Sequence, residues 1–376
     1  MTAAESPAGS PVGVRDGLVA AAALVLFGFA LGLVLLSAGS TLGYDYTCYT
    51  GAARNLVDGR PIYDNAFSIA VGTCPGTYTY PPPFALAMIP WLVFGNWTAP
   101  WCLAMAACFL AGLALLPVRR DVRLVLLIVA ALDWPLLYAI KLGQVEPILF
   151  LLFATTWRWI DRPGTVGFAT AVGALVKIQP ALVAVWAWTT RRRGAATMAV
   201  VWGLVLAGVA TLATGPSAWA TYADLLRGLS GTFSTPHNFA PGAVAHMAGA
   251  SDAISATVQA ASVGAAAAAV LVAWRFTPPV ASLQATILAS QLLSSPLRDH
   301  YAVLLLLPTA WLIGRGRYWA VVFPLAGWLS LANGDDGGSP IAAATIPAAF
   351  FGCLAVVLAE GWRQRGAVVT DRDRAV

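Results

Sequence analysis

The segment Leu42-Gly43-Tyr44-Asp45-Tyr46 directly follows a long apolar run, residues 16–38, which is the first of many such runs in the chain. A carboxylate placed a few residues beyond a membrane span lies at the water interface, where it is both ionised and partly desolvated. Asp45 is therefore a candidate general base, which needs a pKa near the working pH. The alternative is that Asp45 only caps a helix beginning near Cys48.

The composition is that of a membrane protein. Of the 376 residues, 59% are hydrophobic and only 10% are charged, and the mean hydropathy is +0.74. Soluble domains are not built this way. At about 20 apolar residues per crossing, the chain has room for about 12 transmembrane helices, with a range of about 11 to 13. We therefore expect an all-α polytopic membrane protein.

The positive charges orient these spans. Most Arg residues fall in short clusters between apolar runs, which is the pattern of membrane topology and not of a nucleic-acid surface. If the first span runs outward, residues 39–80 and 215–255 become two long extracytoplasmic loops. The basic residues that remain outside are then Arg54, Arg60, Lys141, Lys177, Arg227 and Arg298. The other Lys and Arg residues are cytoplasmic, as the positive-inside rule requires.

The predicted organisation is a single membrane domain, residues 16–360. Residues 1–15 are predicted as a disordered cytoplasmic tail and residues 361–376 as a basic cytoplasmic tail. One stretch is ambiguous, because residues 84–117 contain two apolar runs split by Gly95-Asn96-Trp97. Two full crossings there would place the next Arg cluster outside. Either one run does not cross completely, or that cluster is an exception to the charge rule.

The first outer loop is too long to be a plain connector. Residues 48–56 carry apolar and aromatic side chains at helical spacing, which predicts a short helix on the membrane surface. Cys48 and Cys74 share the loop, and the sequence leaves open whether they form a disulfide. The other three cysteines lie in apolar runs as packing residues.

Only two lysines occur, Lys141 and Lys177, and both lie at predicted outer helix ends. A flexible point charge within apolar sequence favours phosphate or carboxylate binding. The alternative is a lysine that snorkels to the interface. Gln144 and Glu146 stand beside Pro147, where freed backbone groups often line a cavity. A pair between Glu146 and Lys141 would instead make both residues structural.

The segment Leu297-Arg298-Asp299-His300-Tyr301 places a cation, a carboxylate and an imidazole at one more outer helix end. His300 is a candidate for orienting a phosphate or transferring a proton, whereas Arg298 and Asp299 can simply neutralise each other. The second outer loop carries His237-Asn238 and His246, and we expect it to cover the site.

Two further carboxylate positions are interpreted as structural. Asp133 lies at mid-membrane depth and must be paired or neutral, for example at a helix kink. Asp335-Asp336 lies in a Gly-rich setting typical of a solvated turn. The sequence contains no metal-ligand spacing, Walker loop, dinucleotide fingerprint or nucleophile elbow.

Several of these segments, taken in order, resemble glycosyltransferase family 87. The family contains polyprenol-phosphate-mannose-dependent mannosyltransferases of the actinobacterial envelope, such as those of phosphatidylinositol mannosides and lipomannan. The resemblance covers most of the chain, and each of its motifs is short. They are Asp45 after the first span, a helix with Tyr49, Ala52, Ala53, Gly59 and Tyr63, then Tyr80-Pro81-Pro82, Gly143-Gln144, Lys177 with Pro180, and Ser295-Pro296 followed by His300-Tyr301.

The resemblance implies a GT-C membrane fold in the cell membrane, with the site on the extracytoplasmic face. A polyprenyl-phosphate sugar, most simply mannose, would be the donor, and a hydroxyl of an envelope glycolipid or lipoglycan the acceptor. Asp45 would be the base of an inverting displacement that needs no metal or cofactor. Lys177, Arg298 and His300 would bind the donor phosphate. The remaining implied substrate-binding residues are Tyr49, Tyr80, Gln144, Glu146, His237, Asn238, Asp299 and Tyr301.

Two segments depart from the family pattern. Arg298-Asp299 stands where the phosphatidylinositol-mannoside branch has Ser-Trp, and Glu146 stands where Asn is common. The sugar, the acceptor and the linkage therefore stay open. Two other classes remain as alternatives: a transporter or flippase of lipid-linked sugars, and an oligosaccharide ligase or polymerase. Transporters usually place charges mid-membrane on broken helices and show repeated halves, whereas here the polar groups gather at one predicted face.

Overall fold

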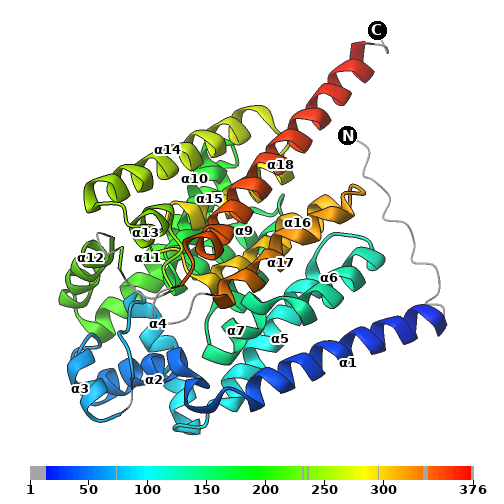
Figure 1. Ribbon diagram of the computed structural model, residues 1–376. Helices are drawn as coiled ribbons and strands as arrows, with labels where there is room; N and C mark the ends of the chain where they lie inside the picture. Colours follow the sequence, from blue (N-terminus) through cyan, green and yellow to red (C-terminus); the bar gives the residue numbers. More distant parts are fainter. Residues whose placement is uncertain are drawn as a thin grey trace.

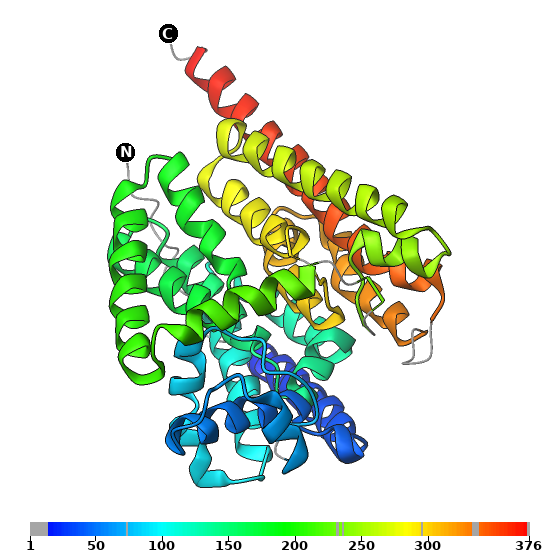
Figure 2. The same cartoon turned by 90° about the vertical axis from the view of Figure 1, so that its left-hand side faces the viewer.

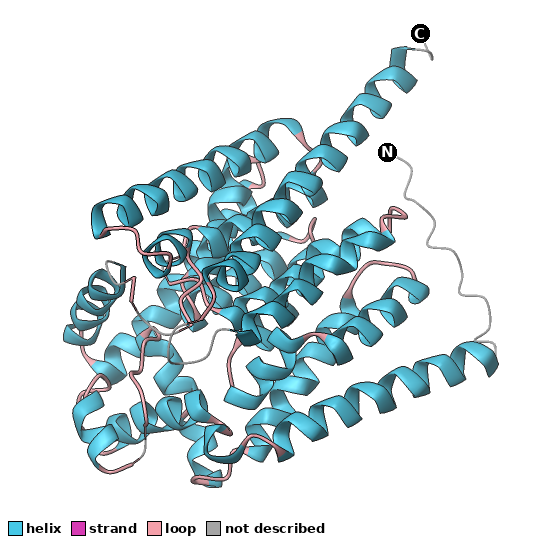
Figure 3. Cartoon of the chain, in the orientation of Figure 1, coloured by secondary structure: helices cyan, strands magenta, loops and turns pink. Residues whose placement is uncertain are grey.

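The computed structural model describes residues 14–72, 74–230, 233–234, 237–294, 296–332 and 338–373. Throughout these ranges the regular structure is helical and no strand occurs (Figures 1 and 3). This confirms the predicted all-α class. Three sequence predictions lie outside the described residues, namely most of the N-terminal tail, Ser295 and the Asp335-Asp336 turn.

The helices follow one another closely along the chain, with η marking a 3₁₀ helix. The first half contains α1 (Val14–Leu36), η1 (Gly39–Thr41), α2 (Tyr44–Val57), α3 (Asn65–Ala70), α4 (Pro82–Ala87), η2 (Ile89–Phe94), α5 (Ala99–Leu115), α6 (Arg120–Leu132), α7 (Trp134–Leu142), α8 (Glu146–Arg158), α9 (Pro163–Val176), η3 (Gln179–Ala181) and α10 (Leu182–Thr189). The second half contains α11 (Arg193–Thr214), α12 (Ser217–Ser230), α13 (Pro241–Met247), α14 (Asp252–Phe276), α15 (Pro279–Leu292), η4 (Asp299–Leu305), α16 (Leu306–Ile313), η5 (Tyr318–Val321), α17 (Val322–Leu325), η6 (Ala326–Ala332) and α18 (Pro340–Asp373).

Within the described residues, four helices are long and apolar enough to cross a bilayer. They lie in Gly17–Leu36, Arg193–Thr214, Asp252–Phe276 and Pro340–Arg365. A fifth candidate is the pair α6 and α7, which is bent by 65°, and the buried Asp133 lies at this break. The other apolar runs form shorter or broken helices. The protein is thus a helical membrane protein, and the number of about 12 spans stays a prediction.

The ambiguous stretch before the first Arg cluster contains one helix of near-spanning length. Its first apolar run forms only α4 and η2, of six residues each, whereas its second run forms α5 with 17 residues. A six-residue helix is far shorter than the roughly 20 residues that a crossing requires. The structure therefore supports the first alternative, in which one of the two runs does not cross completely.

Most of the segment predicted as a basic C-terminal tail is helical. Helix α18 begins at Pro340 and continues through Pro347 to Asp373, so most of residues 361–376 extend the last apolar helix. In Figures 1 and 2 this end of α18 projects from the body of the molecule.

The two segments predicted as outer loops lie against each other. In both views, α2 and α3 of the first segment lie at one end of the molecule with α12 of the second segment nearby (Figures 1 and 2). The ring of Tyr222 on α12 stacks on that of Tyr63, with the centroids 6.2 Å apart. The Tyr63 hydroxyl in turn donates to the backbone oxygen of Tyr80 at 2.8 Å. The contact brings both segments next to the candidate site.

Candidate active site

The position of Asp45 is set by the residue two places before it. Gly43 adopts a φ of +67°, which L-residues with side chains rarely adopt. A Cβ on Gly43 would lie 2.3 Å from Thr98 Cγ2, and the Gly43 N–H donates to the Lys141 backbone oxygen at 2.8 Å. Helix α2 therefore begins directly after a close contact with the chain around residues 98 and 141.

The observed start of α2 corrects the predicted start of the helix in the first outer loop. Helix α2 begins at Tyr44, four residues before the predicted Cys48, because the Gly43 turn and its contact with Lys141 start it early. Asp45 lies inside the first helical turn, and Gly43 occupies the cap position. The capping alternative for Asp45 is thus wrong, and its carboxylate is available for another role.

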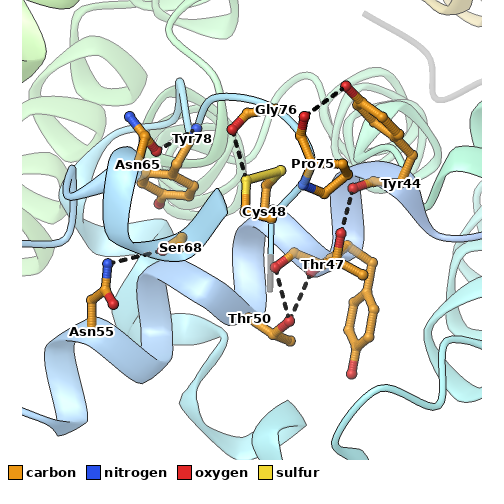
Figure 4. The surroundings of a disulfide bond; sticks show 12 residues. Tyr44, Thr47, Cys48, Thr50, Asn55, Asn65, Ser68, Pro75, Gly76 and Tyr78 are labelled. Carbon is orange, nitrogen blue, oxygen red and sulfur yellow. Dashed lines mark hydrogen bonds between the residues drawn. A yellow bond between two sulfur atoms is a disulfide. The ribbon is translucent and has the colours of Figure 1, made fainter. Parts of the chain in front are cut away.

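A disulfide joins Cys48 on α2 to Cys74, which closes the open question about this pair. Figure 4 shows the bond beside Tyr44 and Thr47, one turn of α2 after the position of Asp45. Next to it, Tyr78 N–H donates to Asn65 Oδ1 at 2.9 Å. The disulfide therefore links the helix that carries Asp45 to the return segment of the loop.

Gln144 connects Asp45 to two buried tyrosines. Its Oε1 accepts from the Tyr80 hydroxyl at 2.7 Å, and the single proton of the Tyr49 hydroxyl lies between that oxygen at 3.2 Å and the Tyr80 hydroxyl oxygen at 2.9 Å. Because these hydroxyls occupy the amide oxygen, the amide nitrogen is the end left to donate to the Asp45 carboxylate, with which Gln144 interacts. Gly143, in the left-handed conformation at the end of α7, makes the turn that places Gln144.

Lys177 and Glu146 form a buried ion pair. Lys177 Nζ donates to Glu146 Oε1, and the exposed fractions of the two side chains are 12% and 1%. Lys177 Nζ also lies 3.8 Å from the centroid of the Tyr301 ring. The sequence alternative that paired Glu146 with Lys141 is wrong, because Lys141 Nζ lies instead 5.4 Å from the Tyr138 ring on the same helix.

His300 lies between two carboxylates. Its Nε2 is 3.7 Å from Glu146 Oε1, and its Nδ1 is 3.3 Å from Asp299 Oδ1. The other oxygen of Asp299, Oδ2, lies 3.4 Å from His237 Nδ1. Burial acts to raise the pKa of Asp299, but hydrogen bonding and charge from both histidines outweigh it and hold that pKa well below its usual value. Asp299 is therefore ionised and lies in contact with both imidazoles.

These groups act together on Asp45. Burial raises the pKa of Asp45 from 3.8 to about 6, although His300 and Gln144 pull it down and Glu146 adds to the rise. Lys177 also acts to lower it. Residues from three distant parts of the chain therefore converge around one carboxylate, whose pKa suits a general base at neutral pH.

Some predicted substrate-binding residues have structural duties. Asn238 Oδ1 accepts from the backbone N–H groups of Ala240 and Leu297, at 3.1 and 3.2 Å, so it ties the second outer segment to the chain before Arg298. Arg298 is half-buried at the start of η4. Tyr49 and Tyr80 are buried and act through Gln144.

Sequence reasoning missed residues that shape the site without touching its charged groups. Trp101 Nε1 donates to the Gly143 backbone oxygen at 2.7 Å, and the Trp101 ring stacks on Tyr46 with the centroids 5.7 Å apart. Thr98 limits position 43 to glycine. A tryptophan within an apolar run gives no local signal of such a contact. The glycine before Tyr44 does give a signal, because glycine often marks a left-handed turn or a close approach of the backbone. Among the described residues no group of three or more His, Cys, Asp or Glu side chains has an arrangement that could hold a metal ion.

Comparison with known proteins identifies a family for more than half of the chain. Residues 78–296 match the sequence profile of glycosyltransferase family 87. The chain is 29% identical over 328 residues to the polyprenol-phosphate-mannose-dependent alpha-(1-2)-phosphatidylinositol pentamannoside mannosyltransferase of Mycobacterium tuberculosis (strain CDC 1551 / Oshkosh). That alignment covers 79% of this chain and 71% of the relative. No solved structure matches. The chain therefore belongs to glycosyltransferase family 87 and is a membrane glycosyltransferase.

Proposed function

We propose that this protein transfers mannose from a polyprenyl-phosphate donor to a hydroxyl of an envelope glycolipid or lipoglycan, with inversion and with Asp45 as general base. The donor is the one in the name of the mycobacterial relative. The observation that carries the proposal is the convergence of Gln144, Glu146, Lys177 and His300 on the Asp45 carboxylate.

The chemistry needs one base and one site for a leaving anion. Asp45 takes the proton of the acceptor hydroxyl while the hydroxyl oxygen forms a bond to the anomeric carbon. The bond from that carbon to the phosphate oxygen breaks, and the polyprenyl phosphate leaves with the electron pair. A single displacement of this kind inverts the anomeric carbon. Because the leaving group is already an anion, nearby cations are sufficient to stabilise it.

Lys177 is the cation best placed for the donor phosphate. In the described structure it is paired with Glu146 and rests on the Tyr301 ring. A phosphate entering this site competes for the ammonium group with Glu146. The second oxygen of Glu146, Oε2, has no hydrogen-bond partner in the described part of the chain and is buried, which suits acceptance of a sugar hydroxyl. His300 and Arg298 complete the proposed phosphate site.

The proposed location is the cell membrane, with a GT-C fold and the site on the extracytoplasmic face. The disulfide between Cys48 and Cys74 supports this orientation, because disulfides persist in oxidising compartments. Family membership favours transfer over non-enzymatic transport.

The test is mannosyl transfer by the purified full chain with polyprenyl-phosphate mannose and candidate glycolipid acceptors, with the product linkage determined. The change Asp45→Asn removes the base without altering side-chain volume, and we expect the rate to fall by about 10² to 10⁴-fold. The control variant is Asp224→Asn, an exposed carboxylate of α12 paired with Arg227, which we expect to leave the rate unchanged. Near-normal turnover by Asp45→Asn would rule out the assignment of the base.

A further inference from the structure

His237 reaches the site from the second outer segment in an unusual backbone conformation. Its φ is +54°, a left-handed value that is uncommon for residues other than Gly, although Asn, Asp and His adopt it more often than the rest. Such a conformation persists only where the surroundings fix it. The fixing contacts follow directly in sequence: Phe239 N–H donates to the Leu297 backbone oxygen at 2.7 Å, and Asn238 Oδ1 accepts from Leu297 N–H.

The result of this docking is a line of polar and charged groups in contact, from the loop into the site. His237 Nδ1 faces Asp299 Oδ2, while Asp299 Oδ1 accepts from the His300 N–H at 2.8 Å and lies 3.3 Å from His300 Nδ1. His300 Nε2 then faces Glu146. Asp299 is only 4% exposed, so few water molecules can replace a lost partner.

We propose that His237 is a positioning residue: through Asp299 it fixes the orientation of the His300 imidazole, so that Nε2 faces Glu146 and Asp45. This role rests on the proposed function and deepens it. His237 touches no reacting atom. It holds one oxygen of Asp299, which leaves the other oxygen for Nδ1 of His300 and thereby selects the ring nitrogen that points into the site.

The chain itself offers a matched control. His246 lies in the same outer segment, and its Nδ1 is 3.3 Å from Asp252 Oδ1, but this pair is exposed, at 38% and 85%. It resembles the His237–Asp299 contact in chemistry and differs in burial and place. The chain has only three histidines, so the ¹⁵N imidazole signals of the full-length protein can be assigned by single substitutions.

The experiment separates the backbone conformation of residue 237 from the contact of its side chain with Asp299. Gly at 237 accepts the left-handed φ but has no side-chain donor, whereas Asn accepts the same φ and keeps a donor. We expect His237→Gly to shift the His300 ¹⁵N signals, His237→Asn to leave them close to those of the unmodified protein, and His246→Gln to leave them unchanged. Identical His300 signals in His237→Gly and the unmodified protein would overturn the proposal.

A kinetic measurement provides the second readout. We expect His237→Gly to lower kcat about tenfold, as for the loss of one polar contact to a buried charged group, with the donor KM within about twofold. In the double variant with Asp299→Asn the rate should equal that of Asp299→Asn alone, because His237 acts through Asp299. Losses that multiply would contradict the proposal. If the unmodified protein transfers no mannose, the proposed function fails, and the ¹⁵N signals still decide the role of His237.

Discussion

The charged groups at the two ends of the molecule are held in opposite ways. At the predicted outer end, Lys177 and Glu146 are 31 positions apart in the sequence and only 12% and 1% exposed. At the predicted cytoplasmic end, Arg119 pairs with Asp121, two positions away, and both are mostly exposed at 73% and 51%. One pair requires the whole fold to form, whereas the other requires a single turn.

The difference separates charges that set topology from charges that form a site. Exposed ion pairs between near neighbours contribute little to stability, and Arg residues at the predicted cytoplasmic end need only be positive to orient the spans. A buried pair carries a large desolvation cost, so its presence points to a specific use. The following variants test this contrast, in order of decreasing effect.

The largest effect is expected for breaking the buried pair. Lys177→Met leaves the Glu146 carboxylate buried without its cation, which typically costs about 3–5 kcal/mol. Thermal unfolding of the purified protein should show the loss, and the apparent donor KM should rise. The double variant with Glu146→Gln should recover most of the stability and none of the donor affinity. Arg119→Ala is the exposed counterpart, and we expect no measurable change in unfolding temperature. An unchanged donor KM in Lys177→Met would count against phosphate contact.

The second largest effect is expected for removal of the disulfide at the predicted outer end. Replacing Cys48 and Cys74 by Ala releases a loop of 26 residues, and a cross-link of this size typically contributes about 2–4 kcal/mol. We expect a lower unfolding temperature and reduced transfer, because α2 carries Asp45 one turn before Cys48. Cys102→Ala is the control for loss of a buried thiol. Unaltered transfer and stability after removing the disulfide would show that α2 is held by its packing alone.

The pH dependence tests the electrostatic environment of Asp45 directly. A general base works in its ionised form, which predominates above its pKa, here raised to about 6 by burial. We therefore expect kcat/KM to fall about tenfold per pH unit on the acid side of that value. The acid limb of this profile should move to higher pH when His300 is replaced by Gln, because His300 acts to lower the pKa of Asp45. A profile that stays flat down to about pH 5 would mean that Asp45 is not the titrating base.

Several polar residues at this predicted outer end could be singled out from the sequence. Lys177, Gln144 and His300 each stood out because a polar group in apolar sequence needs a partner, and the structure brings all three to Asp45. The helical membrane class followed from composition in the same way. The prediction of the class is confirmed because it depends on what a bilayer forbids and not on the detailed path of the chain. The roles of the three side chains stay predictions.

The failures concern the pairing of residues and the limits of helices. The alternative that paired Glu146 with Lys141 is wrong, because the two residues lie on successive helices that turn at Gly143, and Lys141 faces Tyr138. The start of α2 depends on a backbone contact between Gly43 and Lys141, which are 98 positions apart. Contacts of this kind arise from tertiary packing, and local periodicity carries no information about them.

The smallest expected effect comes from a neutral hydrogen bond at the edge of the same cluster. Tyr80→Phe removes the hydroxyl that donates to Gln144 Oε1 at 2.7 Å, while Tyr49 still reaches that oxygen at 3.2 Å. We expect kcat to fall roughly threefold, within the range of one uncharged hydrogen bond, with a small change in unfolding temperature. Tyr63→Phe is the matched control, since its hydroxyl donates to the Tyr80 backbone and not to Gln144. Equal rate losses in both variants would mean that Tyr80 supports the fold of the loop and does not orient the Gln144 amide toward Asp45.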